Sequence, residues 1–170
     1  MATPASQAKF QALLEEHKKI LYKICNLYCK DRYSRDDLAQ EIVLQLWRSF
    51  SKFDGRCLFS TWMYRIALNV AISFYRSERT RTRHVISDDE RLLDTMDETE
   101  SQPEEVRILY QFIEELDPFN KALILLYLDG NSYQEIASVL GITETNVATK
   151  ISRLKNRMKQ ELTGAVNYGT

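Results

Sequence analysis

The chain has 170 residues with 23 basic and 24 acidic side chains, which gives a formal net charge of -1 at pH 7. This length can hold two small helical domains, and the balanced charge excludes the strong basic surplus of a protein that grips duplex DNA unaided. Three prolines, five glycines and long stretches of helical periodicity, with no alternating apolar run, predict an all-α fold.

A helix is predicted first over Lys9 to Cys29. Its apolar residues lie mostly on one side and form a candidate core face: Phe10, Leu13, Leu14, His17, Leu21, Ile24 and Tyr28. Cys25 and Cys29 are one helical turn apart, but no further Cys or His follows at metal-ligand spacing. We therefore expect reduced, structural thiols, and no metal or cofactor.

The next predicted helix is capped by Ser34, with Asp37 at the third helical position. Leu38, Ile42, Leu46 and Phe50 form its buried stripe. A separate stripe beside Trp47 mixes charged and amide groups with one leucine: Asp37, Gln40, Glu41, Leu44 and Arg48. Such a stripe suits a protein interface, although most charged helix faces are simply solvated.

A turn at Asp54-Gly55 opens a loop that carries Phe53, Phe59 and Trp62. From Ser60 a further helix is predicted, whose inward residues are Met63, Ile66, Ala67, Val70 and Phe74 and whose polar stripe is Arg65, Asn69 and Arg76. The rings and the polar stripe can hold unpaired bases, by stacking and by hydrogen bonding. The alternative is that the rings are core, as aromatic residues near a helix start usually are.

Charge changes along the chain and marks a linker. Residues 1–76 carry 12 basic and 7 acidic side chains, residues 77–103 carry 4 and 8, and residues 104–170 carry 7 and 9. The acidic middle part is poor in large apolar residues, which favours a flexible linker. The expected domains are 1–80 and 105–163, with the linker over 81–104 and a tail over 164–170.

A helix-turn-helix is predicted near the C-terminus. Ser132 and Glu135 form a capping box, Gly141 can take the left-handed conformation that ends the short helix, and Thr143 caps the next one. That second helix buries Val147, Ile151, Leu154 and Met158. Its opposite side and flanks carry donors and acceptors suited to base edges and phosphates: Thr145, Asn146, Thr149, Lys150, Ser152, Arg153 and Asn156. A solvated helix pair would explain the periodicity but not the capped glycine corner.

Three segments together resemble one known family, the extracytoplasmic-function (ECF) sigma factors of the sigma-70 family. RDDLAQEIVLQLW at 35–47 is similar to the family's segment that binds core RNA polymerase. FDGRCLFSTWMYRIALN at 53–69 resembles the segment that reads and melts the minus-ten promoter element. The helix-turn-helix resembles the module that reads the minus-thirty-five element, so the order and spacing of all three segments agree with the family.

The resemblance implies a set of site residues for each segment. Core polymerase is expected to bind Asp37, Gln40, Glu41, Leu44, Trp47 and Arg48. Minus-ten DNA is expected at Phe53, Arg56, Phe59, Thr61, Trp62, Arg65, Asn69 and Arg76. The minus-thirty-five element is expected at Thr145, Asn146, Thr149, Lys150, Ser152, Arg153 and Arg157.

The implied function is promoter-specific transcription initiation. The implied partners are core RNA polymerase, through its β′ clamp and β flap, promoter DNA and an anti-sigma factor. Because the sequence shows no catalytic pattern, signal peptide or membrane-spanning run, we expect a cytoplasmic protein that is not an enzyme and does not insert into a membrane. Two alternatives stay open: a stand-alone helix-turn-helix regulator, and a helical interaction protein that does not bind DNA.

Overall fold

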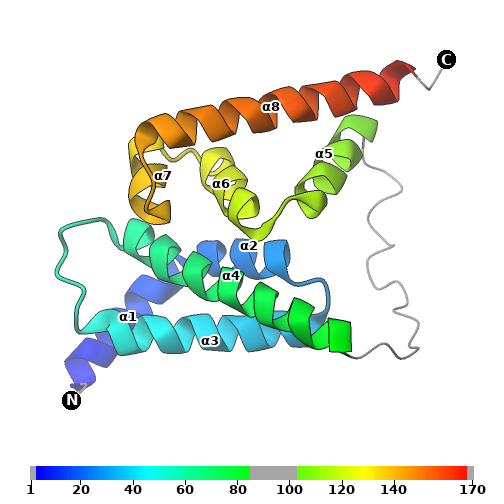
Figure 1. The fold of residues 1–170 in the computed structure, drawn as a ribbon. Helices are drawn as coiled ribbons and strands as arrows, with labels where there is room; N and C mark the ends of the chain where they lie inside the picture. The colour runs from blue at the N-terminus through cyan, green and yellow to red at the C-terminus, as the bar shows by residue number, and fades with distance from the viewer. Residues whose placement is uncertain (1–2, 85–102, 168–170) are drawn as a thin grey trace. The chain divides into compact units, whose positions relative to one another are not determined.

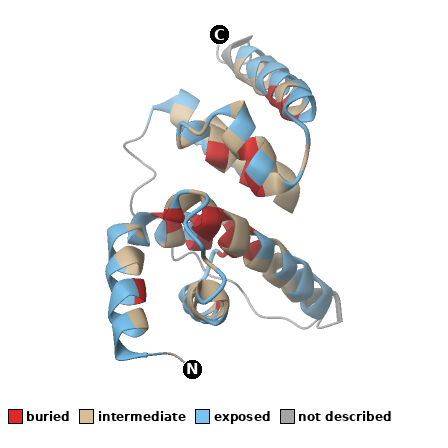
Figure 2. Cartoon of the chain, turned by 90° about the vertical axis from the view of Figure 1, so that its left-hand side faces the viewer, coloured by how far each residue is buried: buried red, intermediate tan, exposed pale blue. Residues whose placement is uncertain are grey.

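The computed structural model describes residues 3–84 and 103–167, and within these ranges the chain forms eight α-helices and no strand. The chain divides into two compact units, Met1–Ile86 and Ser87–Thr170 (Figure 1). In both units the buried positions lie on the inner sides of the helices and the outer sides are exposed (Figure 2). The predicted all-α fold with two helical domains is confirmed.

The first unit contains α1 (Pro4–Glu16), α2 (Lys18–Tyr28), α3 (Arg32–Phe50) and α4 (Phe59–His84). Helices α2, α3 and α4 pack against one another, and α3 lies alongside α4 (Figure 1). The core between them is closed to solvent, because several of its side chains are fully buried: Ile24, Leu38, Ile42, Leu46, Met63 and Ala67. The buried stripe predicted for α3 is therefore confirmed at its first three positions, while Phe50 is half-buried.

The single helix predicted over Lys9 to Cys29 is wrong, because the chain bends at His17 and forms two helices that run in different directions (Figure 1). His17 leaves the helical region at φ -107° and ψ 12°. The bend lets Phe10 of α1 reach the rings of Trp47 and Phe50, while Ile24 of α2 stays in the helical core. No glycine or proline stands at the bend, so no local signal marked it.

The start of α3 also differs from the prediction, which had Ser34 as the capping residue. Asp31 is the N-cap, and its carboxylate accepts a hydrogen bond from the Ser34 backbone N–H at 2.8 Å. Aspartate caps as well as serine does, and its charge interacts favourably with the helix dipole. The helix consequently begins at Arg32.

Helix α4 is buried on two sides, because both α2 and α3 pack against it. Tyr64, Leu68 and Ala71 are buried in addition to the predicted Met63 and Ala67, whereas the predicted inward residues Ile66, Val70 and Phe74 are half-buried. A one-sided periodic pattern could not predict this second buried side.

Parts of the expected linker and of the expected tail are helical. Residues 81–84, expected in the linker, continue α4, and the rest of that linker up to residue 102 lies outside the described residues. Residues 164–167, expected in the tail, continue the last helix.

The second unit contains α5 (Glu104–Glu115), α6 (Pro118–Leu128), α7 (Tyr133–Leu140) and α8 (Glu144–Asn167). Asp117 caps α6 by accepting hydrogen bonds from the backbone of Phe119 and Asn120, and Pro118 occupies the first helical position, where its missing N–H has no partner to lose. Helix α8 packs against α5, α6 and α7. Their contact residues form a small closed core: Phe112, Leu123, Leu126, Ile136, Val147 and Ile151.

We predict that Leu46→Ala lowers the free energy of unfolding of the first unit by about 2 to 5 kcal/mol, because Leu46 is fully buried and its truncation leaves a cavity. Leu44→Ala is the matched control on the same helix: Leu44 is 40% exposed, so the loss is expected to stay below about 1 kcal/mol. Urea unfolding monitored by circular dichroism measures both. Equal losses would contradict the burial pattern.

Candidate nucleic-acid and protein interfaces

The helix-turn-helix is built by the capping groups that the sequence predicts. The Ser132 hydroxyl accepts from the Glu135 backbone at 3.1 Å and the Glu135 carboxylate accepts from the Ser132 backbone at 2.7 Å. Gly141 ends α7 at φ +69°, a left-handed conformation that costs glycine little. The Thr143 hydroxyl then accepts from the Asn146 backbone at 3.1 Å. The capped glycine corner is confirmed.

The outward face of α8 is polar and exposed. Val147, Ile151 and Leu154 are buried, as predicted, and Met158 is half-buried. The opposite side leaves its side chains open to solvent: Thr145, Asn146, Thr149, Ser152, Arg153 and Asn156. Hydroxyl, amide and guanidinium groups at this spacing can donate to and accept from base edges in a major groove.

Three basic side chains of α8 lie over aromatic rings of the neighbouring helices. Lys150 Nζ is 5.4 Å from the centre of the Phe119 ring, and Lys155 Nζ is 4.5 Å from that of Tyr127. The guanidinium of Arg157 lies 5.2 Å from the ring of Phe112. These contacts orient the three cations, and the sequence did not predict them because the rings are distant along the chain.

Two of these cations have further contacts. A hydrogen bond with Tyr127 raises the pKa of Lys155 above its usual value. Arg157 pairs with Glu161 at 3.5 Å and with Glu115 at 3.9 Å. Arg157, expected to contact DNA, is exposed like Arg153, but unlike Arg153 it is oriented by these contacts within its own unit.

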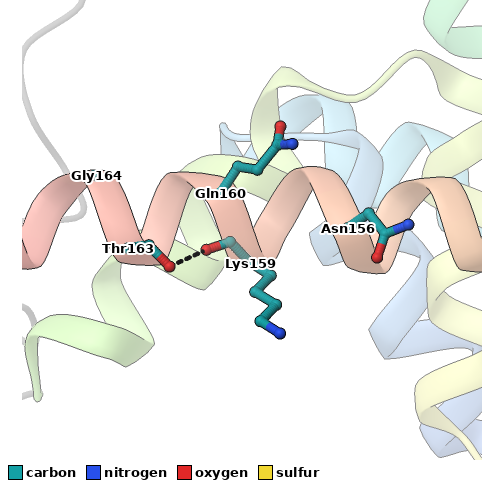
Figure 3. A pocket seen from close by; sticks show the side chains of 5 residues that line it. All are labelled: Asn156, Lys159, Gln160, Thr163 and Gly164. Atoms are coloured by element: carbon teal, nitrogen blue, oxygen red, sulfur yellow. Dashed lines mark hydrogen bonds between the residues drawn. The ribbon is translucent and has the colours of Figure 1, made fainter.

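The polar face continues along α8 into a shallow hollow lined by Asn156, Lys159, Gln160, Thr163 and Gly164 (Figure 3). The Thr163 hydroxyl donates to the Lys159 carbonyl oxygen at 2.8 Å. All five residues belong to one helix, so the hollow is an open strip of helix surface and not an enclosed ligand site.

The loop before α4 is closed by its own contacts. Gly55 has φ +77°, and the Asp54 carboxylate accepts from the Arg56 backbone N–H at 3.1 Å. The Arg56 side chain pairs with the same carboxylate at 2.8 Å. The predicted turn at Asp54-Gly55 is confirmed.

Phe59 and Trp62, which we expected to present ring faces to unpaired bases, are instead buried, with only 6% and 9% of their surface exposed. Their ring centres are 5.4 Å apart and lie 5.6 and 5.1 Å from that of half-buried Phe53. Burying the rings removes apolar surface from water, which favours the core alternative. The stacking role proposed for them does not fit this arrangement.

The polar stripe of α4 is accessible. Asn69 and Arg76 are exposed, and Thr61 and Arg65 are half-buried. These four residues recur at helical spacing along α4, and Arg56 stands in the loop ahead of them. One exposed residue of this region was missed by sequence reasoning: Leu58, which is 68% exposed directly before α4.

The mixed stripe of α3 also faces solvent. Asp37, Gln40 and Arg48 are exposed, and Leu44 is 40% exposed. Glu41 is half-buried and accepts from the Gln45 amide at 2.9 Å. Trp47, expected in the same surface, is half-buried, with its ring 5.1 Å from that of Phe10. Trp47 therefore packs α1 onto α3.

The cysteines carry no sign of a reactive or metal-binding site. All three are free, and burial raises the pKa of Cys25 to about 11 and that of Cys29 to about 12, so both stay protonated at neutral pH. In the part of the chain that the structure describes, no group of three or more His, Cys, Asp or Glu is placed to hold a metal ion. Within residues 3–84 and 103–167, no helix has the length and apolarity needed to span a bilayer.

Comparison with protein families divides the chain as the two units do. The Sigma-70 region 2 model matches residues 13–81, and the Sigma-70 region 4 model matches residues 107–158. The ECF RNA polymerase sigma factor SigX of Bacillus subtilis is 31% identical over 150 residues, which cover 82% of this chain and 76% of SigX. SigW of the same organism is 24% identical over 171 residues, with 92% of this chain and 90% of SigW covered.

Two solved structures have a similar fold. The sigma factor RpoE of Bartonella quintana, in complex with the anti-sigma factor NepR, gives a TM-score of 0.64 at 19% identity and covers 91% of this chain and 97% of its own. CnrH, in complex with the cytosolic domain of CnrY, gives 0.62 at 20% identity and covers 96% and 91%.

The two domains are those of a sigma-70 family transcription initiation factor. Within that family the chain belongs to the ECF sigma factors, as the resemblance of its three segments implied. It is a sigma factor that binds core RNA polymerase and directs promoter-specific initiation. The alternative of a stand-alone helix-turn-helix regulator is not favoured, because a regulator of that kind has no need of region 2.

Proposed function

We propose that this sigma factor reads the minus-thirty-five element with the outward face of α8. The supporting observation is the exposed row of Thr145, Asn146, Thr149, Ser152 and Arg153 on a helix fixed by caps at a glycine corner. Arginine pairs with guanine through two hydrogen bonds, and the short side chains suit other base edges. Lys150 and Arg157, oriented by aromatic rings, are assigned to the flanking phosphates.

For the minus-ten element, we assign the contacts to the loop from Asp54 to Thr61 and to the polar stripe of α4. The amide of Asn69 is exposed and can donate to and accept from the edge of a flipped base. Arg56, Arg65 and Arg76 supply positive charge along the same region. We assign a structural role to Phe53, Phe59 and Trp62: their rings pack against one another and hold the loop to the start of α4, and they do not stack on bases.

The α3 stripe is the surface that we assign to core polymerase, at the coiled coil of the β′ clamp. Leu44 is a partly exposed apolar side chain flanked by the charged or amide groups of Asp37, Gln40, Glu41 and Arg48. An apolar centre with a polar rim is the usual composition of a protein interface. The β flap is the polymerase partner that we propose for the second unit.

An anti-sigma factor is a further partner that we propose. The support is that RpoE of Bartonella quintana, which has a similar fold, was crystallised with the anti-sigma factor NepR. We also propose that the chain acts in the cytoplasm, where RNA polymerase works, and by binding alone. Promoter opening then draws on binding energy and not on covalent chemistry.

Reconstituted transcription tests the whole assignment. We expect core RNA polymerase to start transcripts at defined sites only when the chain is added. The double variant Glu41→Lys with Leu44→Ala should lose both core binding and transcription. It removes the apolar centre of the α3 surface and reverses one charge of its polar rim. Glu16→Lys, a charge reversal on exposed α1, is the control and should stay active. If wild-type chain adds no start sites, the proposed function is wrong. If the double variant binds core normally, only the α3 assignment fails.

The α8 assignment predicts two different defects. Arg153→Ala should weaken promoter binding by about 1 to 3 kcal/mol and relax selectivity at one base position, whereas Lys150→Ala should weaken binding to all sequences alike. Arg107→Ala removes one positive charge at an exposed position of α5 and serves as the control. Holoenzyme binding to a promoter library with a randomised upstream element measures all three. Unchanged selectivity in Arg153→Ala would remove α8 from base reading.

The α4 assignment predicts a defect in melting. Asn69→Ala should slow open-complex formation on duplex promoters about tenfold or more, and the defect should shrink on a template already mismatched at the minus-ten region, because unpairing no longer opposes binding. The permanganate reactivity of unpaired thymines, followed over time, measures how fast the open complex forms on each of the two templates. Gln11→Ala removes an exposed amide from α1 as the control. An equal defect on both templates would mean that Asn69 supports the fold or the polymerase contact.

A further inference from the structure

Leu58 is the large apolar side chain that the loop and α4 leave in solvent. The described residues from Phe53 to Arg76 include many large apolar side chains, but among them Leu58 alone counts as exposed, at 68%. Its neighbours Phe59 and Trp62, which the sequence indicated as the base contacts, are buried in the ring cluster. The large apolar side chain that this segment leaves open to a ligand is therefore a leucine and not an aromatic ring.

The backbone around Leu58 is held firmly. The Leu58 carbonyl oxygen accepts from the Trp62 N–H at 3.1 Å, so this residue is already tied to the first turn of α4. On its other side, the paired Asp54 and Arg56 close the loop. The rings of Phe53, Phe59 and Trp62, from the same loop and the first turn of α4, pack against one another. The backbone that carries Leu58 is therefore held on both sides, although the side chain itself is exposed.

The charge around Leu58 suits a polyanion. The first turn of α4 contains no acidic residue, so the positive end of the helix dipole is not neutralised there. The one acidic side chain of the loop, Asp54, is paired with Arg56. Leu58 also stands three residues before Thr61, at the head of the polar stripe that continues through Arg65 and Asn69.

We propose that Leu58 is an apolar wedge that packs on the face of the last paired base at the edge of the melted minus-ten segment and fills the space of the unstacked base. This inference rests on the proposed function of the loop and α4. Leucine is among the side chains that proteins insert between base steps, and the insertion offsets part of the few kcal/mol that unstacking costs. The polar stripe next to Leu58 would hold the bases that have left the stack.

The test compares Leu58→Ala, Leu58→Gln and Leu58→Met in the reconstituted holoenzyme, on a duplex promoter and on one mismatched at the minus-ten region. Because the wedge needs apolar bulk, alanine and glutamine should slow opening of the duplex about tenfold, and methionine should stay within about twofold of wild type. On the mismatched template all three should stay within about twofold, since no base has to be unstacked. Permanganate reactivity against time gives the rates.

Two further measurements separate the possible explanations. Core-polymerase affinity and thermal stability should be unchanged in all three variants, because Leu58 is largely exposed. Wild-type opening rates in Leu58→Ala and Leu58→Gln would overturn the proposal. So would equal losses on both templates or a loss of core affinity, which would mean that Leu58 docks on polymerase. If wild-type chain itself leaves the thymines unreactive, it is the proposed function of this region that fails.

Discussion

A cluster of aromatic rings holds the first unit together at the place where the proposed nucleic-acid surface begins. The rings connect α1, α3, the loop after α3 and α4, and neighbouring ring centres lie 5.1 to 6.3 Å apart. The cluster consists of Phe10, Trp47, Phe50, Phe53, Phe59 and Trp62. Ring pairs at such distances contribute about 0.5 to 1.5 kcal/mol each beyond the burial of their area. Because the loop is anchored by this packing, its exposed groups are ordered before DNA arrives, and binding loses less entropy.

In the second unit, helix caps and cation–ring contacts hold the exposed groups of α8 in place. Capping groups fix the angle between α7 and α8, and rings of α5 and α6 orient the cations of α8. The whole chain has a net charge of -1; residues 1–76 carry 12 basic and 7 acidic side chains, and residues 104–170 carry 7 and 9. These balances are small for a protein that binds duplex DNA unaided, so we expect counterion release alone to give this chain only a weak hold on DNA. We therefore expect this sigma factor to take most of its hold on DNA from the polymerase, while its own helices contribute selectivity.

Sequence reasoning succeeded where structure depends on near neighbours along the chain. The Ser132 capping box, the Gly141 corner and three of the four positions of the buried stripe of α8 were predicted correctly, because each depends on contacts or spacing within a few positions. The bend at His17 brings Phe10 to the rings of Trp47 and Phe50, which are distant in the chain, so local spacing did not predict it. The burial of Phe59 and Trp62 was the alternative that the sequence left open, because composition and spacing do not show which rings are covered. The same reasoning passed over Leu58, which became distinctive only when the aromatic residues beside it proved to be buried.

The placement of exposed groups also bears on how binding alone can open a promoter. A ligand shifts an equilibrium only by the difference between its affinities for the two states, so contacts made equally to duplex and melted DNA cannot drive melting. The outward face of α8 suits duplex DNA, whose major groove presents base edges, and in the proposed assignment it only positions the protein. The amide of Asn69 suits a base edge that is free only after the base pair has opened. This contact can therefore supply the difference between the affinities for melted and for duplex DNA. A division of this kind lets one unit choose the site while the other responds to the melted state of the DNA.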